Sequence, residues 1–344
     1  MRDLYDLTYD EVAAELGRMG EPAFRAGQVY QWLGRGAGDW PAMTNLPASL
    51  RERLSRTFRL DGLRLSERRV SAIDGTIKCA FLLQDGNLVE SVLMRYRHGY
   101  SICLSSQAGC RMGCAFCASA RAGFGRSLTS GEMLQQVVRF AAMEGVPVHH
   151  AVVMGIGEPL DNYTELVRFL RCLNDPRGFG MGLRHVSVST CGLVDKMIDF
   201  TDEGLPVTLS VSLHAPNDGI RRRLMPIAAR WTMDELLEAC RRHTRVTGRR
   251  VTFEYALFDG VNDRPEHAEE LAERIRGMLA HVNLITANEL ESGGLKQSSG
   301  NAVRRFQDIL AARGIQVTVR RELGSDIMAA CGQLRRRLEE AKDD

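Results

Sequence analysis

The sequence predicts an α/β protein whose main domain contains a parallel sheet, either open or closed into a partial barrel. Short apolar stretches alternate with helical stretches from about residue 98 to residue 322. This alternation is typical of parallel strands that are joined by helical crossovers. Two further observations complete the prediction. Apolar residues recur at helical spacing before residue 65, and apolar and polar residues alternate between residues 66 and 97.

The first two segments are expected to be accessory to the sheet domain. Residues 1–65 show apolar positions at helical spacing and predict a small helical accessory domain. Residues 66–97 predict a β-hairpin lead-in, with strands at 76–83 and 88–94. Asp85-Gly-Asn87 lies between these two strands and is a typical hairpin turn sequence.

The α/β domain is expected over residues 98–322, followed by a C-terminal segment over 323–344. The predicted strands are 100–105, 150–154, 184–189, 207–213, 250–256, 282–287 and 315–320. The predicted helices between them are 131–144, 162–173, 234–247, 267–280 and 301–313. In folds of this kind the chemistry gathers at the carboxyl ends of the strands.

Bulk composition excludes several classes of protein. The chain has 344 residues, of which 44% are hydrophobic and 26% charged, as in ordinary globular proteins. It contains no membrane-spanning apolar run and no secretory signal, so we expect a cytoplasmic protein without membrane contact. All but four of the 45 basic residues are arginine, and short arginine clusters point weakly to a polyanion. A general compositional bias explains the same excess.

The cysteines predict a cluster site rather than a disulfide framework. Their number is nine, and three of them fall in Cys110-Arg-Met-Gly-Cys114-Ala-Phe-Cys117. Thiolates at this spacing can converge from one loop onto an iron–sulfur cluster. Three ligands leave one iron of a 4Fe–4S cluster open, which a catalytic site needs. A structural zinc ion would need a fourth protein ligand, and no further cysteine pair is adjacent.

Polar residues at the ends of later strands form a second group of signals. Met154-Gly-Ile-Gly-Glu158-Pro-Leu160 follows the strand at 150–154, and its glycines allow a ligand to approach the backbone. Later strand ends carry Ser189, Ser212, Leu213, His214 and Asn288. Taken singly, each of these residues also fits ordinary loop chemistry, such as bonding to backbone groups.

Together these motifs resemble the RlmN/Cfr family of radical S-adenosylmethionine (SAM) RNA methyltransferases. The resemblance covers nearly the whole chain, from Phe24-Arg-Ala-Gly-Gln28 to Gln333-Leu334. Besides the cysteine and Gly-Glu-Pro motifs, it is carried by Ser105-Ser-Gln-Ala-Gly-Cys110, Ser212-Leu-His-Ala-Pro-Asn-Asp218 and Ala329-Ala-Cys-Gly-Gln-Leu334. It implies a partial parallel (β/α) barrel of the radical SAM type. The sequence is most similar to the carbon 2 branch of the family.

The resemblance implies a role for each of these residues. Cys110, Cys114 and Cys117 would bind the 4Fe–4S cluster. SAM would be bound by Gly157, Glu158, Ser189, Ser212, Leu213, His214 and Asn288. Cys331 would carry a methyl group, Cys103 would resolve the RNA adduct, and Glu90 would accept a proton. Without the resemblance, Glu90 is only a polar residue on a strand, and a single cysteine fits a small buried side chain.

In the implied reaction, carbon 2 of adenine does not attack the methyl group of SAM directly. Carbon 2 of adenine is not nucleophilic, so one SAM methylates the Cys331 thiolate and a second SAM yields a 5′-deoxyadenosyl radical. That radical removes hydrogen from the cysteine-bound methyl, and the carbon radical adds to the ring. Proton loss and attack of Cys103 on Cys331 then release the product and leave a disulfide.

The resemblance also implies partners. The substrates would be an adenosine of 23S rRNA near the peptidyl transferase centre and the adenosine next to the anticodon in tRNA. Recognition of such sites uses unstacked bases and phosphate contacts, for which the N-terminal domain and the arginine clusters are candidates. The reaction requires a reducing electron donor of the flavodoxin type, and we expect a monomer.

Three alternatives remain open from the sequence. Methylation of carbon 8 of the same rRNA adenosine, as in antibiotic resistance, differs by few residues from the carbon 2 reaction. A non-catalytic iron–sulfur RNA-binding protein would tolerate serine at Cys103 and Cys331. A radical SAM enzyme acting on a small molecule or a protein would not need the Cys331 motif or the N-terminal domain.

Overall fold

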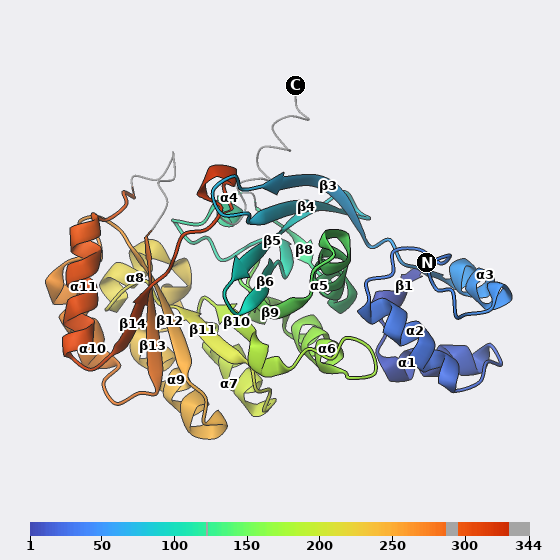
Figure 1. The fold of residues 1–344 in the computed structure, drawn as a ribbon. Helices are drawn as coiled ribbons and strands as arrows, with labels where there is room; N and C mark the ends of the chain where they lie inside the picture. The colour runs from blue at the N-terminus through green and yellow to red at the C-terminus, as the bar shows by residue number, and fades with distance from the viewer. Residues whose placement is uncertain (122, 287–294, 330–344) are drawn as a thin grey trace.

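A ten-stranded sheet dominates the computed structural model, which describes residues 1–121, 123–286 and 295–329. The strand order within these residues is β14-β13-β12-β11-β10-β9-β6-β5-β4-β3 (Figure 1). Every neighbouring pair from β6 to β14 is parallel. The strands from β3 to β6 form an antiparallel meander. The fold is therefore mixed α/β with a large, mainly parallel sheet, as predicted.

All seven strands predicted for the parallel part are present. They are β6 (Gly99–Leu104), β9 (Val148–Val153), β10 (Val186–Thr190), β11 (Thr208–Ser212), β12 (Val251–Leu257), β13 (Ala280–Thr286) and β14 (Gln316–Val319). Their side chains alternate between two faces. In β10, for example, Val186 and Val188 are buried in the main hydrophobic core, whereas Ser187 and Ser189 are only half-buried. The less buried face thus carries the polar side chains of the strands.

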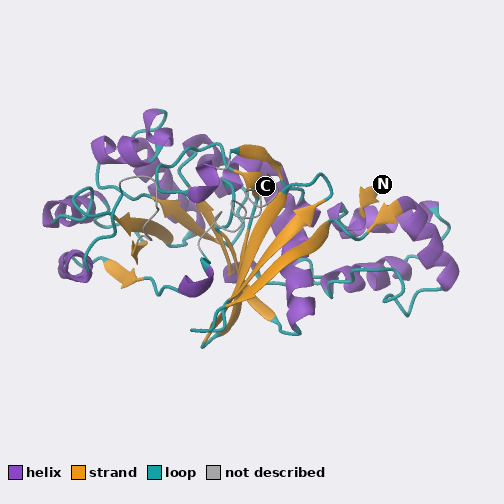
Figure 2. Ribbon diagram, turned by 90° about the horizontal axis from the view of Figure 1, so that it is seen from above, coloured by secondary structure: helices purple, strands orange, loops and turns teal. Residues whose placement is uncertain are grey.

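Helices connect these strands and lie around the outside of the curved sheet (Figures 1 and 2). They are α5 (Ser130–Glu144), α6 (Tyr163–Asn174), α7 (Val194–Asp202), α8 (Asp218–Leu224), α9 (Met233–Thr247), α10 (Pro265–Arg274) and α11 (Gly300–Ala312). Capping boxes at Thr129 and Thr232 begin α5 and α9, and left-handed glycines end both. The short helices α7 and α8 were not predicted. None of the described helices is long and apolar enough to span a membrane.

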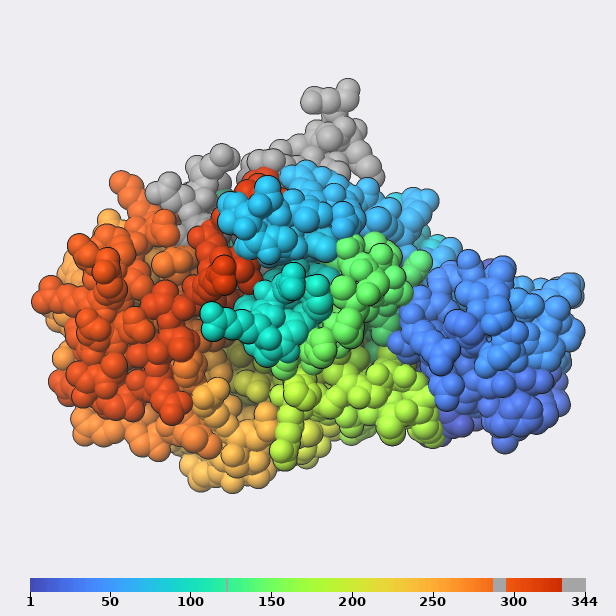
Figure 3. Space-filling model, viewed as in Figure 1, coloured from blue at the N-terminus to red at the C-terminus, as the bar shows by residue number. Residues whose placement is uncertain are grey.

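The N-terminal residues form a helical lobe at one end of the molecule (Figures 1 and 3). Its helices are α1 (Tyr9–Arg18), α2 (Phe24–Gly34) and α3 (Ala48–Thr57). A short parallel pair, β1 (Arg2–Asp3) and β2 (Phe58–Arg59), joins the two ends of this lobe. The lobe packs on α5 and α6, where Asp6 accepts a hydrogen bond from the Gly131 amide (3.0 Å) and Arg168 donates to the Asp6 carbonyl (2.7 Å).

The predicted hairpin is part of a larger antiparallel unit. It consists of β4 (Ile77–Leu83) and β5 (Leu88–Tyr96), and β5 continues the sheet by pairing with β6. A further strand, β3 (Leu63–Val70), pairs with β4 and was not predicted. Half of its sequence, Leu-Arg-Leu-Ser-Glu-Arg-Arg-Val, is charged, and β3 is an edge strand of the described sheet. Exposed charges are a common protection of such edges.

One buried histidine of α9 gives the fold a pH dependence. His243 is 1% exposed, and burial lowers its pKa to about 4. At pH values between about 4 and the ordinary pKa near 6.5, His243 is protonated in the unfolded chain but not in the folded chain. We therefore expect the free energy of unfolding to fall as the pH drops from 6.5 to 4, with a contribution from His243 of up to about 1.4 kcal/mol per pH unit. Urea unfolding at several pH values checks this, because His243→Gln should show a shallower slope than the wild type. An unchanged slope would contradict the assignment.

Candidate active site

The three cysteines of the predicted cluster motif lie on one loop beyond the carboxyl end of β6. The loop follows β7 (Gln107–Gly109), which pairs with β8 (Phe124–Ser127), and it ends at the short helix α4 (Ala118–Arg121). The Cys110 amide donates to the Gly123 carbonyl (3.1 Å), and the Ala115 amide donates to the Leu224 carbonyl at the end of α8 (2.9 Å). Backbone contacts thus fix the loop at its start and in its middle.

The thiols of this loop are half-buried and close to one another. Burial raises the pKa of both Cys110 and Cys114 to about 12, and the neighbouring Cys117 thiol contributes to both increases. Within the described residues, no three His, Cys, Asp or Glu side chains are close enough to share one metal ion. Ligands of a multi-iron cluster bind different iron atoms and stand farther apart than ligands of a single ion. Cys110, Cys114 and Cys117 are the side chains of this loop that would hold such a cluster.

An aromatic and apolar environment surrounds the loop. The Phe116 ring lies 4.6 Å from the His214 ring and 5.7 Å from the Phe258 ring, measured between centroids. Cys114 and Phe116 pack against a buried apolar cluster that includes Cys191 and Phe258. Such surroundings exclude water from the thiol side of a bound cluster, which is one means by which proteins tune cluster potentials.

The glycines of the Gly155–Glu158 stretch allow close packing of the chain on itself. A Cβ atom at Gly155 would lie 2.7 Å from the Leu104 carbonyl carbon, and one at Gly157 would lie 2.6 Å from the Gln107 Cβ. Gly157 also has a φ of 111°, a conformation that favours glycine. These glycines therefore bring the strand end after β9 against the chain that leads into the cluster loop.

Replacing Gly157 should be far more costly than replacing a glycine in open space. We expect Gly157→Ala to lower the free energy of unfolding by roughly 2–5 kcal/mol, from the positive φ and from overpacking. Gly204→Ala is the matched control, because Gly204 also has a positive φ (64°) but its Cβ would meet no atom within 4 Å. The control should lose only about 1 kcal/mol. Equal losses in thermal or urea unfolding would contradict the packing argument.

Glu158 is buried and already accepts two backbone hydrogen bonds. Its Oε2 accepts from the Cys191 amide (2.7 Å) and its Oε1 from the Leu160 amide (3.1 Å). Burial raises the pKa of the Glu158 carboxyl, and these hydrogen bonds lower it in part. The Thr190 and Cys191 side chains also hydrogen-bond to this carboxylate, so much of its acceptor capacity is used within the chain. The carboxylate thus links the end of β10 to the turn after β9 at the predicted SAM site.

The stretch from Ser212 to His214 is fixed against β12. The Leu213 and His214 amides donate to the Glu254 carbonyl, at 3.0 and 3.3 Å. His214 Nδ1 accepts from the Ala256 amide (2.9 Å), and the His214 carbonyl accepts from the Asn262 side chain (2.8 Å). Burial lowers the pKa of His214 to about 3, so this ring is neutral. Its role in the structure is therefore to order the strand end, next to Phe116.

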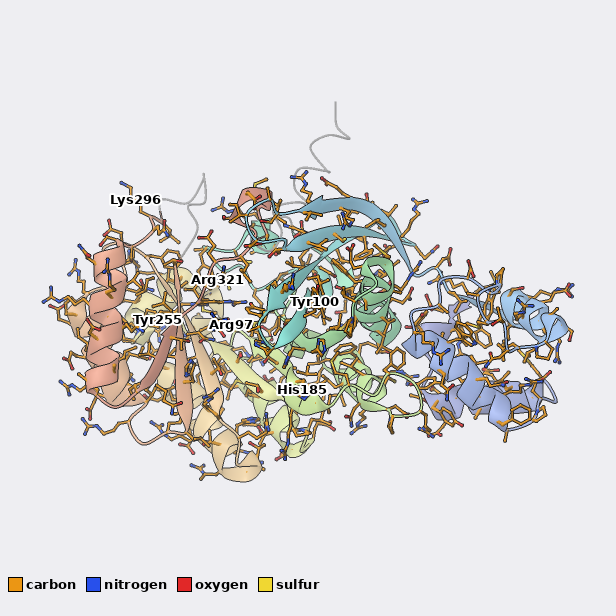
Figure 4. The ribbon with its side chains drawn as sticks, in the orientation of Figure 1. Arg97, Tyr100, His185, Tyr255, Lys296 and Arg321 are labelled. Carbon is orange, nitrogen blue, oxygen red and sulfur yellow. The ribbon has the colours of Figure 1, made fainter. Side chains whose placement is uncertain are left out.

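Of two further residues predicted to contact SAM, the structure describes Ser189 but not Asn288. Ser189 is half-buried on the polar face of β10, two residues before Cys191. Asn288 lies outside the described residues. The structure thus brings together the cysteine loop, Glu158 and His214 at one edge of the sheet, with Ser189 and Ser212 near the ends of neighbouring strands. His185, labelled in Figure 4, directly precedes β10 and marks the opposite edge.

A buried arginine at this edge was not predicted as a site residue. Arg221 of α8 is fully buried and donates to the Cys191 carbonyl (2.7 Å). Its Nε and the second terminal nitrogen have no hydrogen-bond partner. In the sequence it belongs to Arg221-Arg-Arg223, one of the short arginine clusters that point weakly to a polyanion. Only its burial distinguishes it, and an arginine run gives no signal of which member turns inward.

The predicted proton acceptor and the predicted resolving cysteine meet at a second place on the same sheet. Glu90 on β5 and Cys103 on β6 line one narrow cavity, together with Gly155, Ile156 and Ala329. Glu90 is 4% exposed and lies 3.3 Å from the ammonium group of Lys78 on β4. Cys331 lies outside the described residues, two positions beyond Ala329 in the sequence. The structure thus joins two of the three predicted catalytic residues and the segment that leads to the third.

Comparison with known proteins agrees with this geometry. Residues 2–60 match the family described as the ribosomal RNA large subunit methyltransferase N-terminal domain, and residues 104–275 match the radical SAM superfamily. Relatives from Alkaliphilus oremlandii and Clostridium tetani are each 46% identical, over 97% and 98% of this chain and 98% and 97% of their own lengths. Both are named as probable dual-specificity RNA methyltransferase RlmN.

Two solved structures extend the comparison. A radical SAM methyltransferase from Sphaerobacter thermophilus is 45% identical, with a TM-score of 0.93 over 97% of this chain and 99% of that chain. SuiB of Streptococcus suis, in a structure bound to SAM, is 13% identical with a TM-score of 0.50 over 63% of this chain and 49% of that chain, which shows the fold alone. From its family domains, its full-length relatives and its fold, the chain belongs to the RlmN family of radical SAM RNA methyltransferases.

Proposed function

We propose that this protein methylates carbon 2 of an adenosine in 23S rRNA near the peptidyl transferase centre, and of the adenosine next to the anticodon in tRNA. The observation that carries the proposal is the cavity between β5 and β6. It places a carboxylate, Glu90, and a thiol, Cys103, beside Ala329 in the segment that leads to Cys331. A methyl carrier, a proton acceptor and a resolving thiol are the groups that this reaction requires. The relatives' names, which give a dual-specificity RNA methyltransferase, and the ribosomal RNA methyltransferase model at the N-terminus support an RNA substrate.

The residues at the carboxyl ends of the parallel strands fit the two cofactors of the family. Cys110, Cys114 and Cys117 would hold a 4Fe–4S cluster, and Glu158 would accept from the amino group of SAM. The further SAM contacts would come from Gly157, Ser189, Ser212, Leu213, His214 and Asn288. When bound, cluster and SAM supply a methyl group and a 5′-deoxyadenosyl radical, with two SAM molecules used in each turnover. The protein contributes by excluding water, since Phe116 and the apolar cluster around Cys191 cover one side of the loop.

The catalytic side chains act around the Glu90 cavity. Cys331 takes up the methyl group as a thiolate and later presents it to the adenine. Glu90 accepts the proton from the ring carbon. Cys103 then attacks the Cys331 sulfur, so that the RNA is released and a disulfide remains for a thiol to reduce.

We propose the partners on chemical grounds. The helical lobe of residues 1–65 would contact RNA, because it presents exposed Phe24 beside Arg25 and the Trp32 ring beside Arg35, groups suited to stacking and phosphate contacts. The reaction needs a reducing compartment, which places it in the cytoplasm, and an electron donor of the flavodoxin type. We also propose that the protein acts as a monomer.

The test is a reaction with purified components. The anaerobically reconstituted enzyme is incubated with SAM, a reductant and unmodified 23S rRNA or tRNA, and the nucleosides are analysed by mass spectrometry. We expect 2-methyladenosine from the wild type and none from Cys331→Ala. Formation of 8-methyladenosine would assign the chain to the carbon 8 reaction. SAM cleavage without RNA methylation would overturn the proposed substrate while leaving the radical chemistry intact.

A further inference from the structure

The segment before Cys331 is held by the turn between β3 and β4. Asp326 accepts from the Ser71 hydroxyl (2.7 Å) and from the Ala72 amide (2.8 Å). Asp74 accepts from the Gly324 amide (2.8 Å). Figures 1 and 3 show this segment lying against the β3–β4 hairpin at the top of the molecule. The hairpin therefore anchors a part of the chain that is about 250 residues away in sequence.

Lys78 connects this anchored segment to Glu90. Its ammonium group donates to the Met328 carbonyl (2.6 Å) and lies 3.3 Å from Glu90 Oε2. Met328 precedes Cys331 by three positions. One side chain thus contacts both the carboxylate of the proposed proton acceptor and the backbone of the proposed methyl-carrying segment.

The sheet register places Lys78 on the same face as the cavity. Lys78 is paired with Val92, and Val92 is paired with Cys103, so the three side chains form a row across β4, β5 and β6. Glu90 is two residues from Val92 on the same strand and shares this face, because side chains alternate along a strand. Val92, Glu90 and Cys103 all line the cavity. The lysine therefore points toward the catalytic groups rather than toward the helices.

The burial of Lys78 is unusual for its residue type. The side chain is 0% exposed, whereas lysines are rarely fully buried unless they are paired. A buried ammonium is retained only where its partners compensate for lost hydration. Here those partners are a carboxylate and a carbonyl that both belong to the proposed catalytic apparatus.

We propose that Lys78 is a positioning residue that holds the Glu90 carboxylate against the Met328 backbone for the proton transfer. This inference rests on the proposed function. In the transfer, the carbon–hydrogen bond at the adenine ring carbon breaks, its electron pair stays with the ring, and the proton binds a Glu90 oxygen. Lys78 neither gains nor loses a proton in this step. It acts by holding the accepting oxygen at the cavity.

The test compares how far each variant proceeds with labelled RNA. Glu90→Gln is the reference, because loss of the proton acceptor should trap RNA on the protein as a covalent adduct, visible on a denaturing gel. We expect Lys78→Met to trap the same adduct and to slow formation of 2-methyladenosine by roughly tenfold or more. SAM cleavage in the first turnover should stay within about twofold of the wild type, because the cluster loop is untouched. Lys78→Arg, which keeps the charge and its donors, should restore product formation at least in part.

Further variants separate a loss of function from a loss of folding if Lys78→Met does not fold. Lys78→Gln retains a donor without the charge and is less disruptive, so it replaces Lys78→Met if circular dichroism shows that the latter is unfolded. Lys196→Met removes a lysine on the surface helix α7, whose side chain is 42% exposed, and should behave as the wild type. If Glu90→Gln traps an adduct and neither neutral Lys78 variant does, the inference is overturned and the proposed function stands. If Glu90→Gln itself traps none, the proposed role of Glu90 and the inference both fail.

Discussion

Replacing Cys114 with alanine is expected to abolish SAM cleavage. The family requires an iron–sulfur cluster, and Cys114 is the middle one of three thiols that one fixed loop brings together. Two remaining ligands would leave two irons of a 4Fe–4S cluster without protein coordination, so the cluster should be lost or degraded. Iron content, the visible absorption of the reconstituted protein and the yield of 5′-deoxyadenosine measure this together. We expect all three to fall to background.

The matched control for Cys114 is a cysteine of the main core, where burial has a similar effect on the thiol. Cys240 of α9 is fully buried, and burial likewise raises the pKa of its thiol to about 12, but it packs in the main core. Cys240→Ala should retain the iron and the SAM cleavage of the wild type, with only a modest loss of stability. Full iron content in Cys114→Ala would show that another residue is the third ligand, and the site would have to be rebuilt around it.

The parallel sheet was predictable from local sequence because short apolar or alternating stretches recur between helical stretches. The missed elements lack that signal. β3 carries three arginines and a glutamate, and its strand character comes from pairing with β4, which no local pattern encodes. The helices α7 and α8 are nine and seven residues long, too short for their periodicity to stand out.

The candidate site was predictable where the chemistry sits in one contiguous motif, as in the cysteine loop and the Gly-Glu-Pro turn. It was not predictable where contacts join distant segments. Neither the burial of Arg221 against the Cys191 carbonyl nor the Lys78–Met328 contact leaves a pattern in the sequence. The hydrogen bonds that occupy Glu158 and His214 were foreseen only as a general alternative to ligand binding, because sequence alone does not show which backbone amides will lie nearby.

Replacing Cys103 with alanine is expected to stop the reaction after one chemical event on each enzyme molecule. Cys103 lines the cavity with Glu90 and Ala329, and in the proposed function its thiol attacks the sulfur of Cys331. Without this thiol the proposed adduct has no route to a disulfide, and the RNA should stay attached. Denaturing gels with labelled RNA should show a protein–RNA band that persists. The yield of 2-methyladenosine should remain below one per enzyme, and the first SAM cleavage should proceed at the wild-type rate.

The control for Cys103 comes from the neighbouring strands of the same sheet. Cys79 on β4 is fully buried in the main core, on the face opposite Lys78 and the cavity. Since both are single cysteines of the antiparallel part, Cys79→Ala tests whether loss of any thiol there slows turnover, and we expect normal turnover. A wild-type yield from Cys103→Ala would remove Cys103 from the mechanism, and the cavity would then serve Glu90 and the Cys331 segment alone. A persistent adduct in Cys103→Ala but not in Cys79→Ala would establish that position on the sheet, rather than thiol content, determines release.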